Sequence, residues 1–205
     1  MLIELSLLLL CAAAAYLLYS DFKWASVIAF ASLLPIALYV EQNGIASGIW
    51  SWSLGGPSVL QVPITVILSY AVGGMIIAAV SISRYDDRAQ DWPAFKYALL
   101  FGFLLYALGP LAFKGSLHFL GKFILASAIL YKLGSRPLAL VGAAVASADY
   151  ALETAAIYLG ELTYYTPTYV QGLPPSIFLG MGLAAIIFGG FAIILDKKLQ
   201  QTRLR

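Results

Sequence analysis

Three acidic residues lie within or at the end of strongly apolar stretches, where an ionised side chain is unfavourable. Asp149 and Glu153 are four residues apart, so a helix places both carboxyl groups on one face. Two carboxyl groups one turn apart in a low dielectric do not both ionise readily, and one is expected to keep a proton. A buried, protonated carboxyl group can donate that proton to an apolar substrate. Glu41 closes another apolar stretch and is the third candidate acid.

Aromatic residues follow two of these acids along the chain. Trp50 and Trp52 come shortly after Glu41, while Tyr164 and Tyr165 come shortly after Glu153. These four rings are therefore candidates for the same site as the acids. Taken singly, each ring also fits an anchor at the membrane interface.

A structural interpretation of the acids competes with the catalytic one. Lys114, His118 and Lys122 recur every four residues, and Lys122 is able to pair with Glu153 or Asp149 as a packing contact. No metal site is expected, because the chain has one His and one Cys. Since no phosphate-binding loop or dinucleotide fingerprint is present either, we expect no cofactor.

Composition identifies the environment in which these residues act. The chain has 205 residues, of which 61% are hydrophobic and 11% charged, and its mean hydropathy is +0.88. A soluble domain with so little charge could not cover its surface, so the chain is expected to be an integral membrane protein. The net charge of +2 gives nucleic-acid binding no electrostatic basis. The length fits a single membrane domain over residues 1–205.

Seven apolar stretches approach the ~20 residues that a helix needs to span a bilayer. Together they predict an all-α bundle of seven transmembrane helices. Ten of the 12 Lys and Arg residues then fall on one side, which predicts an N-terminus outside the plasma membrane and a cytoplasmic C-terminus. The predicted spans are Leu2–Tyr19, Trp24–Val40, Val59–Ile82, Phe95–Phe113, Leu117–Leu133, Leu138–Tyr158 and Ser176–Leu195.

The two halves of the chain align with each other at a shift of 112 residues. Glu41 then matches Glu153, Gly48 matches Gly160, and Trp52 falls on Tyr164. This pattern predicts a parallel internal repeat of residues 1–83 and 113–196, in which spans 1–3 match spans 5–7 and span 4 is the connector. The repeat would bring Glu41 and Glu153 to the same outer half of the bundle.

Short motifs around these residues resemble those of membrane proteins of carotenoid biosynthesis. The segment from Glu41 to Gly48 is similar to the E-x-x-G-[IV]-x-[ST]-G element of the carotenoid hydratase family, and Asp149 with Glu153 is similar to its paired acids. The repeats are also similar to the integral-membrane lycopene cyclase domain, although its P-x-E-E element is missing after Pro63.

This resemblance implies an enzyme, a hydratase or a cyclase, that protonates the terminal alkene of a carotenoid or another apolar isoprenoid. The resemblance implies that Glu41, Asp149 or Glu153 would donate the proton. The ring faces of the four aromatic residues would then stabilise the resulting carbocation, an interaction worth about 2 kcal/mol when it is desolvated: Trp50, Trp52, Tyr164 and Tyr165. Two other classes remain open: a non-catalytic protein that binds a lipid or carotenoid or serves as an assembly subunit, and a small proton-coupled permease. The sequence leaves the substrate and the oligomeric state undetermined.

Overall fold

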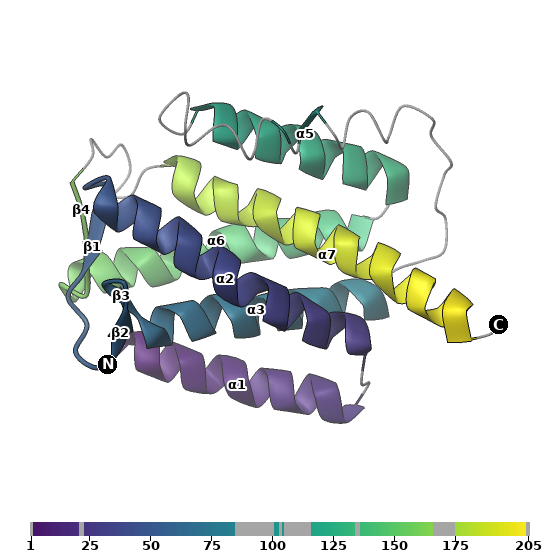
Figure 1. Cartoon of the computed structure of the whole chain (residues 1–205), viewed down its shortest axis with the longest axis horizontal. Coiled ribbons are helices and arrows are strands. Elements are labelled where there is room, and N and C mark those ends of the chain that lie inside the picture. The colour runs from purple at the N-terminus through teal and green to yellow at the C-terminus, as the bar shows by residue number, and fades with distance from the viewer. Residues whose placement is uncertain are drawn as a thin grey trace. The chain divides into compact units, whose positions relative to one another are not determined.

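The computed structural model describes residues 2–20, 23–84, 101–102, 104, 116–133, 136–165 and 175–203 (Figure 1). These residues form six long α-helices and two short antiparallel ribbons. The helices are α1 (Leu2–Ser20), α2 (Trp24–Ala46), α3 (Ile64–Ser83), α5 (Ser116–Leu133), α6 (Arg136–Tyr158) and α7 (Pro175–Arg203). The strands are β1 (Trp50–Trp52), β2 (Ser58–Val59), β3 (Val62–Pro63) and β4 (Leu162–Tyr164).

Five of the described helices, α1, α2, α3, α6 and α7, are long and apolar enough to cross a membrane. The chain is therefore a helical integral membrane protein, as its composition predicted. Helix α5 coincides with the predicted span Leu117–Leu133 but is not among these five helices, so its crossing of the membrane stays a prediction. The predicted span Phe95–Phe113 lies almost wholly outside the described residues, so the total of seven spans stays a prediction.

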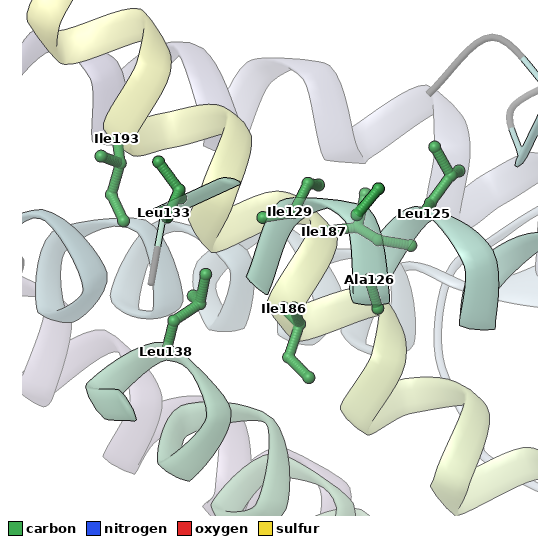
Figure 2. Close-up of a cluster of buried hydrophobic side chains, with 9 residues drawn as sticks. Leu125, Ala126, Ile129, Leu133, Leu138, Ile186, Ile187 and Ile193 are labelled. Atoms are coloured by element: carbon green, nitrogen blue, oxygen red, sulfur yellow. The ribbon is translucent and has the colours of Figure 1, made fainter. Parts of the chain in front are cut away.

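The chain folds as two compact units. The first comprises Met1–Ala79 with Ala148–Pro175, and the second comprises Val80–Ser147 with Ser176–Arg205. In the second unit, buried aliphatic side chains of α5 and α7 form a core together with Leu138 at the start of α6 (Figure 2). The close approach of α5 and α7 is evident at Gly190, where a Cβ atom would lie 2.2 Å from the Ile129 side chain. Small residues at such contacts are typical of helix packing in membranes.

The first unit has a smaller core between α2 and α3. Ala37 of α2 and Ile67 of α3 are buried there with Val62 of β3. The helices are in close contact, since a Cβ atom at Gly74 would lie 1.7 Å from Cδ1 of Leu33. This packing fixes the end of α2 relative to the start of α3, where the candidate site is built.

The long aromatic connections after α2 and α6 contain the strands. Strand β1 pairs antiparallel with β4, with Trp50 opposite Tyr164, Ser51 opposite Thr163 and Trp52 opposite Leu162. The second ribbon is the β2–β3 hairpin, whose two central residues, Leu60 and Gln61, have φ angles of 51° and 67°. Figure 1 shows β1 and β4 together at the end of the first unit where α2 finishes.

Candidate functional site

Glu41 lies in the last two turns of α2 and is 2% exposed. Its Oε2 atom accepts two hydrogen bonds, one from the indole N–H of Trp50 at 2.9 Å and one from that of Trp52 at 2.8 Å. The two indoles converge because residues i and i+2 of a strand point to the same face. An indole N–H is a donor only, so this oxygen of Glu41 acts as an acceptor in both bonds.

Glu153, the residue that the repeat matches with Glu41, occupies a similar position near the end of α6. It is 7% exposed, and its Oε2 atom accepts a hydrogen bond from the Tyr164 hydroxyl at 2.9 Å. Burial, together with the neighbouring Glu153 carboxyl group, raises the pKa of the Tyr164 phenol well above its ordinary value. The phenol therefore keeps its proton and remains the donor at physiological pH.

The two acid–aromatic units lie next to each other. The rings of Trp50 and Tyr164 are 5.9 Å apart between centroids and tilted by 58°, within the range of favourable edge-to-face contact. Asp149, one turn before Glu153, is close enough to interact with it electrostatically. Tyr70 of α3 interacts with all three acids, so it belongs to the same site. The sequence patterns did not single out Tyr70, because the shift of 112 residues matches it with Gly182 and not with another aromatic residue.

Tyr165 lies apart from the other predicted aromatic residues. It is 64% exposed, and its hydroxyl is 2.8 Å from Oγ of Ser51. Ser51 alternates along β1 with the two tryptophans and therefore projects from the opposite face of the ribbon. The inner face of the ribbon thus carries Trp50, Trp52 and Tyr164 toward the acids, whereas Tyr165 belongs to its outer, hydroxyl-bearing face.

Glu161, which the acid pattern did not include, joins the ribbon to the first helix. Its Oε1 and Oε2 atoms accept hydrogen bonds from the backbone N–H groups of Leu2 and Ile3 at 3.0 and 3.4 Å. The first N–H groups of a helix have no partner within the helix, so this carboxylate caps α1 from a distant part of the chain. Partial burial raises the pKa of Glu161, but the hydrogen bonds that it accepts at the start of α1 lower it overall.

The carboxyl groups of Glu41 and Glu153 act as hydrogen-bond acceptors for side chains of the β1–β4 ribbon. Glu41 binds two indoles and Glu153 one phenol, in each case through its Oε2 atom. The described residues contain no group of three or more potential metal ligands. Lys122 belongs to the second unit, where its ammonium group lies 3.5 Å from the position of a Cβ atom on Gly180, and its pairing with an acid stays a prediction.

The fold is similar to that of a solved membrane protein. No protein-family model matches the sequence, and no curated protein matches it significantly. The chain resembles MvINS, a mycobacterial Insig homologue from Mycobacterium vanbaalenii, with 17% identity and a TM-score of 0.58. A cross-linked trimer of a cysteine variant of MvINS gives 18% identity and the same TM-score. Both alignments cover 82% of this chain and 94% of the other.

This similarity corrects two predictions from the sequence. The resemblance to carotenoid hydratases and lycopene cyclases was wrong, because the chain shares its fold with an Insig homologue. The prediction of an enzyme that hydrates or cyclises a carotenoid is wrong for the same reason. What remains of the sequence interpretation is the membrane environment and the cluster of acids and aromatic residues. The chain is thus a helical membrane protein with the fold of the Insig homologue MvINS.

Proposed function

We propose that this chain is a non-catalytic membrane protein that binds an apolar lipid within the bilayer. The observation that carries the proposal is the hydrogen bonding of Glu41, whose Oε2 atom receives both indole donors of β1. A general acid needs a transferable proton directed at its substrate. Glu41 instead holds a strand in place, and Glu153 does the same for Tyr164. The fold is similar to that of an Insig homologue and not to that of a carotenoid enzyme, which also argues against the catalytic interpretation.

The site has the mixture of surfaces that a lipid-binding protein needs. Aromatic rings on the inner face of the ribbon provide apolar contacts, while Glu153, Asp149 and Tyr70 provide a few polar groups at one place. Ligand sites are commonly apolar with a small number of convergent polar groups that fix orientation. We propose that the aromatic residues predicted for a substrate contact the ligand, with Tyr165 at the outer edge.

Proton-coupled transport is the less favoured function. Transporters of this kind commonly bind their substrates where helices are interrupted near the midplane of the membrane. Helix α6, which carries Asp149 and Glu153, is continuous from Arg136 to Tyr158. We also propose an N-terminus outside and a cytoplasmic C-terminus, since ten of the 12 basic residues follow that arrangement.

The test is to identify the lipid that the protein binds and to determine whether the protein alters it chemically. The protein is expressed in a bacterial strain that accumulates lycopene and purified in mild detergent, and its lipids and pigments are analysed by mass spectrometry. Photoreactive acyl-chain, sterol and polyene probes are then crosslinked to the wild type and to Trp52→Ala. Thr163→Ala is the matched control, because this exposed residue lies on the same ribbon but faces away from the acids.

We expect a lipid to copurify without chemical change and one probe class to label the wild type and Thr163→Ala, with at least five-fold less labelling of Trp52→Ala. A product of altered mass that disappears in Glu153→Gln would instead identify an enzyme. Equal labelling of all three proteins by every probe would also contradict the proposal, because it would mean contact with bulk lipid alone.

A further inference from the structure

The end of α2 and the end of α6 have the same local structure. Trp52 lies 11 residues after Glu41, and Tyr164 lies 11 residues after Glu153, and each donates to Oε2 of its glutamate at 2.8 and 2.9 Å. In each copy a glycine with positive φ turns the chain between the glutamate and its aromatic partner. These glycines are Gly48, with a φ angle of 64°, and Gly160, with a φ angle of 71°. The N–H groups of these glycines bond to the carbonyl groups three residues earlier at the same distance, 3.0 Å.

The pairing of β1 with β4 relates the two copies by a local two-fold axis. Ser51 and Thr163 match at the shift of 112 residues, and they lie directly opposite each other in the ribbon. On either side the positions exchange, so that Trp50 lies opposite Tyr164 and Trp52 opposite Leu162. A two-fold axis through the central pair, Ser51 and Thr163, produces this exchange, because it carries Trp50 onto Leu162 and Trp52 onto Tyr164.

Among the positions at which the two copies differ, Gly44 and Trp50 are in contact with each other in the first copy. Trp50 of the first copy corresponds to Leu162, and Gly44 corresponds to Ala156. A Cβ atom at Gly44 would lie 2.0 Å from Cζ2 of Trp50, so the Trp50 ring occupies the space that an alanine side chain would fill. In the second copy, where Leu replaces Trp, an alanine is accommodated and is fully buried.

We propose that Gly44 and Trp50 form one interlocked pair whose counterpart across the local two-fold axis is Ala156 and Leu162. The absence of a side chain at Gly44 allows the Trp50 indole to reach Glu41. Gly44 is thus a positioning residue, and it determines that Glu41 binds two indoles while Glu153 binds one phenol. This inference does not depend on the proposed lipid binding and goes beyond it.

The first experiment is a double-mutant cycle that converts one copy into the other. Gly44→Ala is expected to lower the thermal midpoint by about 5 °C, because extra atoms in a packed site force a neighbour to move. Gly44→Ala in the Trp50→Leu background reproduces the second copy and should cost nothing further. Gly73→Ala is the matched control, since no atom lies within 4 Å of a Cβ at Gly73.

The second readout reports position, which stability alone does not. In spectra of ¹⁵N-labelled protein, the indole signal that Trp50→Leu removes is assigned to Trp50, and Gly44→Ala should shift it away from its hydrogen-bonded position. The combined change Ala156→Gly and Leu162→Trp should add an indole signal that moves in a Glu153→Gln background. The proposal would be overturned if Gly44→Ala lowered the thermal midpoint equally with Trp50 and with Leu at position 50. It would also be overturned if the new indole signal did not move in the Glu153→Gln background. If the variant carrying Ala156→Gly and Leu162→Trp does not fold, the cycle at Gly44 and Trp50 decides alone.

Discussion

Replacing each glutamate by glutamine should distinguish the roles of the two acids. Glu41→Gln keeps an acceptor of nearly the same shape but makes two indole hydrogen bonds neutral. For an ionised Glu41, each bond contributes about 1.5–3 kcal/mol, against about 1 kcal/mol for a neutral one, so the expected loss is about 2–3 kcal/mol. Glu153→Gln weakens a single bond from Tyr164 and removes the unfavourable burial of a second carboxyl group beside Asp149. These effects oppose each other, and we expect a net change near zero.

The difference can be measured by thermal unfolding of purified protein in detergent, followed by size exclusion. For a chain of this length about 2–4 °C of thermal midpoint corresponds to 1 kcal/mol, so Glu41→Gln should lower the midpoint by about 5–10 °C. Glu153→Gln should remain within about 2 °C of the wild type. Thr163→Ala is the control for substitution at the ribbon. An equal loss from the two glutamine variants, or a larger loss from Glu153→Gln, would refute the reasoning.

Three further predictions follow from other contacts. Tyr164→Phe removes the hydroxyl that bonds to Glu153, and it should cost about 1–2 kcal/mol in the wild type and less when Glu153 is already replaced by leucine, as measured by thermal unfolding. Gly74→Ala should cost about 1–3 kcal/mol because its Cβ atom would overlap Leu33, whereas Gly73→Ala should be neutral or slightly stabilising; equal effects would contradict the close approach of α2 and α3. The lowered pKa of Glu161 means that its cap on α1 is complete above pH 4.5 and is lost as the pH falls through the folded pKa. Amide hydrogen exchange at the start of α1, corrected for intrinsic rates, should therefore accelerate in acid for the wild type, with no such pH dependence in Glu161→Gln.

The helices could be predicted from the sequence, because the apolar runs are long and each is nearly continuous. The predicted span Leu2–Tyr19 differs from α1 by one residue at its end, and Leu117–Leu133 differs from α5 by one residue at its start. The acids were identified by their cost in an apolar environment, which is a local property of the sequence. The sequence assigned Trp50, Trp52 and Tyr164 a cation-stabilising role, whereas in the structure they donate hydrogen bonds to Glu41 and Glu153.

The β1–β4 ribbon and the similarity to an Insig homologue could not be predicted from the sequence. A strand of three residues has no measurable periodicity, and the partner of β1 lies more than 100 residues away in the chain. The motif that suggested carotenoid enzymes reflects local geometry: Gly44 accommodates the Trp50 ring, and Gly48 adopts the positive φ that ends α2. Residues required by such a turn are able to recur in unrelated membrane proteins, so their spacing carries little information about chemistry.

The pairing of β1 with β4 has a consequence for the order in which the protein is made. Strand β1 is synthesised together with α2, but its partner follows only after another 110 residues, which takes about 5–20 s at ordinary rates of translation. During that interval the edge of β1 has no neighbouring strand. The bonds from Trp50 and Trp52 to Glu41 span only 9 and 11 residues, so they can form as soon as this segment leaves the ribosome. Glu41 would then hold β1 in its final conformation before β4 is made. Strand β4 would pair with a strand that is already ordered.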